Sequence, residues 1–472
     1  TPCYREQFST DDFAIRPDNF ALTVPSGENI NLLTSAQEYS FPATAKQYGS
    51  ATATNDYNIT AANLVLSLTR TMYQPSNIID DNLSGALSFS TTPFNILNGV
   101  ANTLIKFDDV GKVNIQLRDT TWANVDSDDT SGDCNATGRY ICGDINATFI
   151  PDHFTLSAVH LNNNSAQTFT YLSDDLNMSA HLDVNVSAKN LSNAVTQNFK
   201  SGSWENPVDV NMSVVSAAST PTIIKDDINE TQNLGFSLGA IVIPWNETNA
   251  TKKLMFNFNR DVNDSKNPFM INGSEMTLGA KSAYTDSGTT KIVTGSSVAD
   301  QNATFIYGRT HAPRYRFTDN NGTALIYYEA FCNGIDSNST TCNKALLPNG
   351  ISSLSTDDPR WFINTLHTSV SGGAETVTQK SASLISATTT PTGNHKDSVS
   401  LTYDGSKGNP YKATMQNSAS SWLIYNKYIP TSTKNEFEVE FEGSGSQWTG
   451  KHETNTTTIK SGADKTNRRT MW

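Results

Sequence analysis

Long apolar runs are missing from this sequence. The strongest, residues 238–245, has eight residues and contains both Gly239 and Pro244, whereas a membrane-spanning helix needs about 20 apolar residues. A signal peptide is missing as well, because Thr1-Pro2-Cys3 cannot serve as one, and we expect a mature or truncated product with sequence upstream of it. This segment is therefore not expected to insert into a membrane.

Charged residues are also scarce, at 17% of the chain, and the net charge of −13 is spread along it. Proteins that bind nucleic acid carry a basic patch, so nucleic acid is excluded as a partner, and the acidic charge indicates solubility. Sequence signatures of catalysis are missing too, because there is no nucleophile elbow, phosphate loop, dinucleotide fingerprint or His-Glu-x-x-His motif. We therefore do not expect an enzyme.

No long segment repeats its apolar residues with the 3.6-residue period of a helix, whereas strand patterns occur throughout. Residues 436–442 alternate between acidic and apolar side chains, as in a half-buried strand. Residues 64–68, 240–243 and 324–328 are more evenly apolar and suit inner strands. Clusters of Gly, Pro, Asn and Asp separate these segments. The predicted fold class is all-β.

Two internal repeats indicate modules. Residues 16–22 and 150–156 share Pro, Asp, Phe and Leu at the same offsets, and residues 146–150 recur as 302–306, each time with an Asp two residues earlier. We interpret the repeats as module starts. The prediction is an elongated tandem array of immunoglobulin-like β-sandwich modules, with boundaries at residues 1–146, 147–301 and 302–472.

The cysteines indicate the redox compartment. Cys134 and Cys142 lie close in sequence, as do Cys332 and Cys342, and each pair sits among the Gly, Asn, Asp and Ser typical of surface loops. Two disulfides would each stabilise the fold by about 2–3 kcal/mol. A metal site is the alternative, but zinc sites favour closer cysteines with a histidine nearby. Cys3 is left over, and it could pair with an upstream segment, bond another chain or be free.

Asn-x-Ser/Thr sequons are the most specific signal. Of 18 sequons, 14 have Asp or Glu two residues before the Asn, although 46 acidic residues in 472 predict about two. The 14 candidate glycosylation residues are Asn58, Asn82, Asn135, Asn146, Asn177, Asn185, Asn211, Asn229, Asn249, Asn263, Asn302, Asn321, Asn338 and Asn455. The other four, Asn163, Asn190, Asn246 and Asn272, follow Leu161, Ala188, Pro244 and Met270 at that offset.

The extended pattern Asp/Glu-x-Asn-x-Ser/Thr resembles the acceptor consensus of the bacterial oligosaccharyltransferase of Campylobacter-like bacteria. This resemblance implies N-linked glycans and export through the periplasm. Strand alternation is the competing explanation, because alternate residues of a strand face the same side. In Asp183-Val184-Asn185-Val186-Ser187, for example, alternation alone would place three polar residues outward. Asp is unfavourable in strands, however, so its repeated use at one offset favours glycosylation.

One acidic loop is a candidate cation site. Asp126, Asp128, Asp129 and Asp133 place four carboxylates around a Ser- and Gly-containing turn, and Ca²⁺ takes oxygen ligands from such loops. The spacing is not that of an EF-hand, and a solvated acidic loop explains the same composition. A basic cluster, Arg309, Arg314 and Arg316, lies amid acidic sequence, and we expect these side chains to pair with carboxylates rather than bind an anion.

Several short segments also carry a family resemblance. Residues 13–20, 107–111, 149–154 and 307–309 resemble, in this order, the large C-terminal domain of unknown function of MSHA-pilus-associated protein Q and similar bacterial surface proteins. Residues 422–425, 437–441 and 467–472 are similar to the terminus of Campylobacter-group relatives. The resemblance implies a surface or pilus-associated protein with no established catalytic residues.

Together these patterns predict an extracellular, N-glycosylated surface or filament-associated protein with a structural or adhesive role. Its expected partners are other surface or pilus subunits, host or cell-surface glycans or proteins, or further copies of itself. The alternative is a set of carbohydrate-binding accessory modules of a larger exported enzyme. A catalytic motif in the upstream sequence would favour this alternative, and a pilin-like leader would favour the first prediction.

Overall fold

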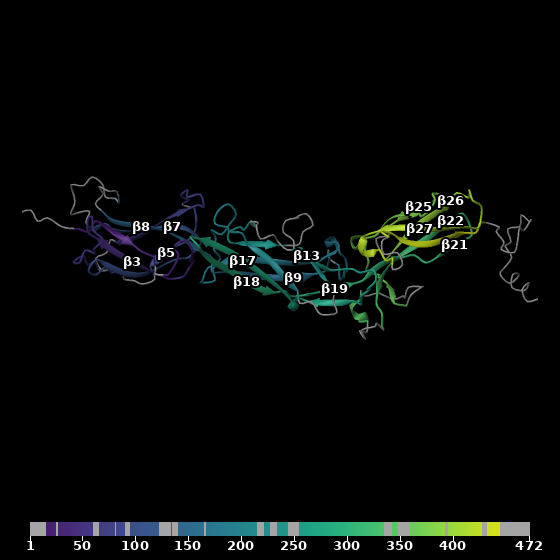
Figure 1. The fold of residues 1–472 in the computed structure, drawn as a ribbon, viewed down its shortest axis with the longest axis horizontal. Coiled ribbons are helices and arrows are strands. Elements are labelled where there is room, and N and C mark those ends of the chain that lie inside the picture. The colour runs from purple at the N-terminus through teal and green to yellow at the C-terminus, as the bar shows by residue number, and fades with distance from the viewer. Residues whose placement is uncertain are drawn as a thin grey trace, which may run out of the picture.

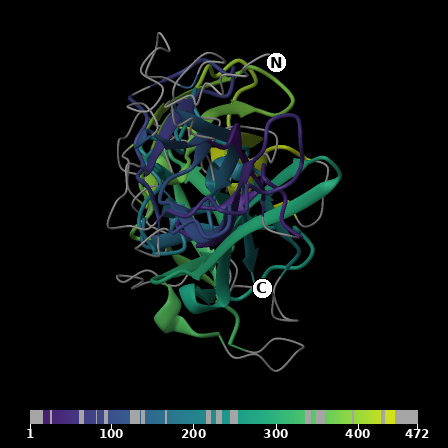
Figure 2. The ribbon, with the colours of Figure 1, turned by 90° about the vertical axis from the view of Figure 1, so that its left-hand side faces the viewer.

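The computed structural model describes residues 16–24, 27–59, 66–80, 82–89, 95–121, 134, 140–164, 167–214, 221–226, 234–243, 254–334, 342–347, 359–391, 395–426 and 432–443. These residues form 28 β-strands and five single-turn 3₁₀ helices, and none of them lies in an α-helix. The strands build three β-sandwiches that follow one another along the longest axis (Figure 1), and the view along that axis superimposes them (Figure 2). The predicted elongated, all-β array is confirmed.

The first sandwich has two four-stranded sheets. One contains, in spatial order, β1 (Asn19–Leu22), β3 (Tyr39–Lys46), β6 (Val100–Phe107) and β5 (Leu87–Phe89). The other contains β2 (Leu33–Thr34), β8 (Ile141–Ile150), β7 (Gly111–Asp119) and β4 (Leu66–Tyr73). Alternate residues of these strands meet between the sheets, where Phe107, Val113 and Phe149 are buried.

The second sandwich has the same layers, with several strands interrupted. One sheet contains β9 (His153–Asn162), β11 (Ala180–Lys189), β14 (Ala240–Ile243), β15 (Met255–Phe258) and β13 (Ile223–Asp226). The opposite layer consists of β12 (Asp209–Val214), β17 (Met276–Asp286) and β18 (Thr289–Val298), continued by β10 (Thr170–Tyr171), β19 (Asn302–Ile306) and β16 (Phe269–Asn272). Phe256, Phe258 and Phe305 pack edge to face or tilted in its core.

The third sandwich completes the array. One sheet contains β20 (Gly308–His311), β22 (Asn321–Phe331), β26 (Lys396–Tyr403) and β25 (Ile385–Thr390), with β23 (Trp361–Ile363) also paired to β22. The other contains β21 (Tyr315–Phe317), β28 (Asn435–Phe441), β27 (Tyr411–Ala419) and β24 (Ala374–Gln379). The 3₁₀ helices are η4 (Leu176–Met178), η5 (Gly273–Glu275), η6 (Lys344–Leu346), η7 (Ser369–Ser371) and η8 (Ser421–Leu423).

All three sandwiches share one topology. The first strand of each (β1, β9 or β20) pairs antiparallel with the next long strand (β3, β11 or β22). Between these two strands the chain visits the opposite sheet, where a short strand (β2, β10 or β21) pairs parallel with the last strand of the sandwich (β8, β19 or β28). With the remaining strands in the order of an immunoglobulin constant-type domain, the structure is a tandem of immunoglobulin-like modules.

The internal repeats occupy equivalent places in the first two sandwiches. Phe20 and Phe154 lie near the starts of the equivalent strands β1 and β9. The backbone of Phe20 crosses closely over Gly143 on β8, and the backbone of Phe154 crosses over Gly295 on β18. A Cβ on either glycine would lie 2.0 Å from the carbonyl oxygen of the Phe that crosses it. The second repeat forms the end of β8 (residues 146–150) and the whole of β19 (residues 302–306), and it therefore closes modules instead of opening them. The boundary placed after residue 146 accordingly falls inside β8, and the boundary after residue 301 falls between β18 and β19.

The junction between the first two sandwiches is polar and buried. Asp109 is 4% exposed, and its carboxylate accepts hydrogen bonds from the Gln197 and Asn198 backbone N–H groups, both at 3.1 Å, and from the Ser84 hydroxyl at 2.7 Å. The Asn198 side chain donates back to the Ser84 and Val110 carbonyl oxygens at 2.7 and 3.0 Å. Because buried polar groups are costly when unpaired, this reciprocal network fixes how the two sandwiches meet.

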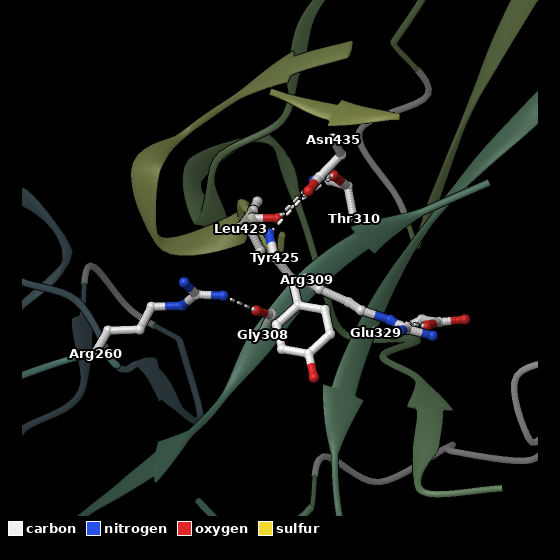
Figure 3. A network of polar contacts seen from close by, with 8 residues as sticks. All are labelled: Arg260, Gly308, Arg309, Thr310, Glu329, Leu423, Tyr425 and Asn435. Atoms are coloured by element: carbon white, nitrogen blue, oxygen red, sulfur yellow. Dashed lines mark hydrogen bonds and ion pairs between the residues drawn. The ribbon is translucent and has the colours of Figure 1, made fainter. Parts of the chain in front are cut away.

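The junction between the second and third sandwiches combines apolar packing with two arginines (Figure 3). Arg260 donates to the Gly308 carbonyl oxygen at 2.9 Å and lies over the Tyr307 ring. Arg309 points from β20 toward Glu329 on β22, with 2.7 Å between Nε and the carboxylate, and stacks on Trp361. Both partners of this ion pair are almost fully buried, with side-chain exposures of 10% and 1%. Glu329 and Trp361 belong to the third sandwich, as Arg309 does, whereas the hydrogen bond from Arg260 to Gly308 crosses between the two sandwiches.

Candidate glycosylation sites

Five of the acidic sequons in the described ranges have their Asn in a strand. Asn146, Asn185, Asn211 and Asn302 belong to β8, β11, β12 and β19, and Asn321 is the first residue of β22. The residues on both sides of Asn185 and of Asn211 are buried in the core. Asn146, Asn211 and Asn302 are exposed, and Asn185 is half-buried. Each amide therefore lies on the outer face of a sheet, as alternation predicts.

Turn chemistry accounts for the acidic residue at three other sequons. Asp80, Asp175 and Asp261 each accept a hydrogen bond from the backbone N–H of the Asn two residues later, at 3.0, 2.9 and 2.8 Å. This is the Asx-turn, which Asp forms readily in loops. The turn gives the acidic offset a local structural role at Asn82, Asn177 and Asn263. The Asx-turn gives no such role to the acidic residue of the strand sequons, because an extended strand cannot form this turn.

The acidic sequons differ from the others in exposure. Of the nine acidic-sequon asparagines in the described ranges, eight are exposed and Asn185 is half-buried. The exposed eight are Asn58, Asn82, Asn146, Asn177, Asn211, Asn263, Asn302 and Asn321. The carboxamides that a transferase must reach are therefore on the surface at these positions.

The sequons without the acidic residue hold structural asparagines instead. Asn190 is 2% exposed, and its Nδ2, the atom that would carry a glycan, donates to the Asp108 carbonyl oxygen at 2.7 Å in the first junction. Asn163 accepts a hydrogen bond from the Thr304 backbone N–H at 2.9 Å. Asn272 is the N-cap of η5. Wherever the structure describes them, the exposed sequon asparagines follow an acidic residue, and those that lack the acidic residue are buried or half-buried.

Several predicted positions lie outside the described residues. Among them are Asn135, Asn229, Asn249, Asn338 and Asn455, the candidate calcium ligands Asp126, Asp128, Asp129 and Asp133, and Cys3. Within the described ranges, no group of three or more His, Cys, Asp or Glu side chains is placed to hold a metal ion. In the same ranges no helix is long and apolar enough to cross a membrane.

Both predicted disulfides are present. Cys134 and Cys142 are bonded with their Cα atoms 5.6 Å apart, and Cys332 and Cys342 with theirs 5.3 Å apart. Each separation lies within the range of protein disulfides. The second bond belongs to the apolar cluster at the junction of the second and third sandwiches, beside Tyr171 and Phe362.

The three arginines of the basic cluster pair with carboxylates, as predicted. Arg309 bonds Glu329, and both Arg314 and Arg316 bond Glu440 at 2.9 Å. The Arg316 guanidinium, by hydrogen bond and charge, lowers the pKa of Glu440. Arg309 pairs between β20 and β22, and Arg314 and Arg316 pair with Glu440 on β28, so these side chains are engaged in ion pairs and are not arranged as an anion site.

Residues 109–306 match the family model described as DUF6701, third domain. The matched stretch begins at the junction residue Asp109 and contains β7, β8 and the whole second sandwich. This part of the chain is therefore similar to a domain of unknown function, which agrees with that part of the sequence resemblance. None of the curated proteins matches the chain.

Solved structures resemble the chain only in broad outline. Domains 4 and 5 of the S-layer protein SbsC are 8% identical, cover 61% of this chain and 100% of their own, and have a TM-score of 0.19. A marsupial T cell receptor is 8% identical over 90% of this chain and 99% of its own, with a TM-score of 0.21. The endo-fucoidan hydrolase MfFcnA4 is 9% identical over 87% of this chain and 44% of its own, with a TM-score of 0.17. No functional argument follows from scores of this size.

Proposed function

We propose that this chain is a stiff, N-glycosylated spacer of an exported bacterial surface or filament-associated protein. In this role the three sandwiches hold neighbouring domains apart and carry glycans on their outer faces. The chain itself supplies no catalysis. Its partners are other surface or pilus subunits, host or cell-surface glycans or proteins, or further copies of the same chain.

The observation that carries the proposal is the division of the sequons. Exposed asparagines follow an acidic residue, whereas Asn190, which lacks one, uses its Nδ2 in a buried hydrogen bond. Strand alternation alone offers no reason for this division, because it places a polar residue outward whether or not an acid precedes it. A transferase that requires the acidic residue would act on the accessible set.

Two further features support export and a spacer role. Disulfides persist in oxidising compartments, and this chain has two. The hydrogen bonds of Asp109 at the first junction and of Arg260 to the Gly308 carbonyl oxygen at the second join consecutive sandwiches through paired polar groups, which resists bending between modules. A stiff, extended array suits a protein that displays something at a distance from the cell.

The test is intact-mass and glycopeptide mass spectrometry of the natively purified protein. We expect glycans at Asn58, Asn185 and Asn211, and bare asparagines at Asn163 and Asn190. Unmodified Asn58, Asn185 and Asn211 would refute the proposal. Electron microscopy of the same material addresses the partners, because filaments would show self-assembly and dispersed rods would favour a spacer in a larger protein.

A further inference from the structure

Three sequons of the second sandwich have nearly the same sequence. Residues 183–187, 209–213 and 261–265 all read Asp-Val-Asn-x-Ser and differ only at the variable position, which is Val186, Met212 or Asp264. Any enzyme that reads the acidic residue, the Asn and the Ser meets the same side chains at each. The structure around each Asn is therefore the main difference among them.

Asn263 lies in an exposed turn. The Asp261 carboxylate accepts its backbone N–H at 2.8 Å, and the Asp264 N–H bonds the Asp261 carbonyl oxygen at 3.3 Å. Val262 is half-buried, and the segment belongs to no strand. Lifting these residues into an active site breaks local turn contacts and the hydrogen bond from the Tyr307 hydroxyl to the Asp261 carbonyl oxygen at 2.9 Å, but it breaks no ladder between strands.

Asn211 lies in a strand with one paired edge. β12 ends its sheet and pairs with β17, where Gly279 is opposite Asn211. Val210 and Met212 on either side are buried, with exposures of 0% and 2%. Lifting this segment breaks one ladder and withdraws two side chains from the core.

Asn185 lies in a strand paired along both edges. It is opposite Ser157 on β9 and Val242 on β14. Val184 and Val186, with exposures of 1% and 0%, fill the core beneath it. Removing residues 183–187 from the sheet therefore breaks two ladders, which amounts to unfolding the sandwich. Central strands open only with the global transition.

Glycosyl transfer to such a segment requires access from more than one side. The reaction forms a bond between the Asn Nδ2 and the anomeric carbon of a diphosphate-linked oligosaccharide. It breaks the anomeric C–O bond, so the diphosphate leaves with the bonding electrons, and one amide proton is released. An enzyme that performs this step while contacting the acidic residue, the Asn and the Ser must surround five residues of the acceptor. At Asn185 this space is taken, because neighbouring strands about 4.8 Å away occupy both edges of β11.

We infer that Asn185 receives its glycan before the second sandwich folds, whereas Asn263 remains a good acceptor after folding. Asn211, on its edge strand, lies between the two. This inference rests on the proposed function, since it takes the acidic sequons to be glycan acceptors. It adds that glycan transfer and folding of this chain occur in a fixed order at Asn185.

The experiment uses the full chain, purified without glycans, folded and oxidised, and presented to a purified bacterial oligosaccharyltransferase with its lipid diphosphate-linked donor. Three synthetic peptides, residues 181–189, 207–215 and 259–267, serve as unfolded acceptors of matched sequence. Site-specific initial rates are measured by glycopeptide mass spectrometry, and the rate in the folded chain is divided by that of the corresponding peptide.

We expect this ratio to be within about tenfold of one at Asn263 and to fall by about a thousandfold or more at Asn185, the scale of transiently unfolded populations. Natively produced protein should nevertheless carry a glycan at Asn185. A ratio near one at Asn185 would overturn the inference, as would a bare Asn185 in native protein whose peptide is modified. If no peptide is modified, the proposed function itself fails.

Discussion

At the scale of single residues, asparagines within one motif perform different tasks. Asn190 joins two sandwiches: its Nδ2 donates to the Asp108 carbonyl oxygen at 2.7 Å, and its Oδ1 accepts from the Ala194 N–H at 2.9 Å. Asn211 is exposed and donates only to the Asp209 carboxylate at 3.2 Å. The burial of the amide, which the motif does not encode, decides between the two roles.

We predict that Asn190→Ala lowers the free energy of unfolding by about 1–3 kcal/mol, because it leaves a buried carbonyl and a buried N–H without their partner. The matched control, Asn211→Ala, should change it by less than about 0.5 kcal/mol, since surface substitutions rarely do more. Urea titrations on protein produced without glycans measure both values. Equal effects of the two substitutions would contradict the assignment of Asn190 to the junction.

His367 is a second residue whose burial has a measurable consequence. Its ring stacks on Tyr328 with 3.5 Å between centroids, and the Tyr171 hydroxyl lies 3.1 Å from Nδ1. Burial lowers the pKa of His367 to about 3 from its usual 6.5. The folded protein therefore holds this imidazole neutral over a range of pH in which the unfolded chain protonates it.

The folded protein therefore loses stability as the pH falls. The stabilising contribution of neutral His367 is complete above pH 6.5 and is lost as the pH falls toward 3, at up to about 1.4 kcal/mol per pH unit. We predict that His367→Phe makes the free energy of unfolding fall less steeply between about pH 6.5 and 5, where carboxylates stay ionised. Chemical denaturation across this range measures the slope. Identical slopes for the two proteins would mean that burial does not lower the pKa of His367 in the folded protein.

At the scale of strands, close crossings of the backbone set the geometry of each sandwich. Gly295 on β18 lies under Phe154, where an added Cβ would be 2.0 Å from the Phe154 carbonyl oxygen, and Gly143 repeats this arrangement under Phe20. Gly279 on β17 has more room, since a Cβ there would meet only the end of the Asn211 side chain at 3.2 Å. Glycine is therefore required at the crossings and replaceable on the neighbouring strand.

We predict that Gly295→Ala costs about 2–3 kcal/mol of stability, because the backbone above it must shift to accommodate the methyl group. Gly143→Ala should have a similar effect on the first sandwich, and Gly279→Ala should change stability by less than about 1 kcal/mol. Thermal or urea unfolding of the three variants provides the comparison. Similar losses at Gly279 and Gly295 would mean that the crossing tolerates a side chain.

Strands were predictable from local pattern, but their places in the sandwich were not. The alternation in residues 436–442 correctly predicts the half-buried strand β28. The run 240–243 predicts an inner strand, and this is wrong, because β14 lies at the end of its sheet, pairs with β11 and directs Val242 outward with 61% exposure. Four apolar residues do not reveal which face is covered, because that depends on what packs there.

The repeats and the junctions show the same limit. Residues 146–150 and 302–306 are equivalent, as the sequence indicates, but they end modules, and only the pairing of β2 with β8 and of β10 with β19 reveals this. Sequence reasoning missed Asp109 and Asn198 as junction residues. The only signal for Asp109 was the resemblance carried by residues 107–111, and Asn198 lies outside every segment that carries it. Which loops of two modules meet is decided by packing at long range, and no local pattern reports it.

At the scale of the whole molecule, stiffness depends on the junctions. Asp109 extends from the first sandwich and accepts two backbone N–H groups of the second, Gln197 and Asn198. Asp108 beside it uses its carboxylate within the first sandwich, where it accepts the Ala86 N–H at 2.5 Å. Substituting each of these adjacent aspartates in turn therefore distinguishes the contribution of the junction to stiffness from the contribution of the first sandwich alone.

We predict that Asp109→Ala loosens the array and Asp108→Ala does not. Without the Asp109 carboxylate, the N–H groups of Gln197 and Asn198 lose their buried partner, and hydration of the junction becomes favourable because it satisfies them. Small-angle X-ray scattering should then give a broader distribution of interatomic distances and a shorter mean end-to-end length, while each sandwich keeps its own unfolding transition. Asp108→Ala should scatter as the parent protein does. An unchanged scattering profile for Asp109→Ala would mean that the Asp109 hydrogen bonds do not stiffen the array. The stiffness would then come from the apolar contacts around Trp204, which packs against the cores of both sandwiches, and the spacer role would depend on those contacts.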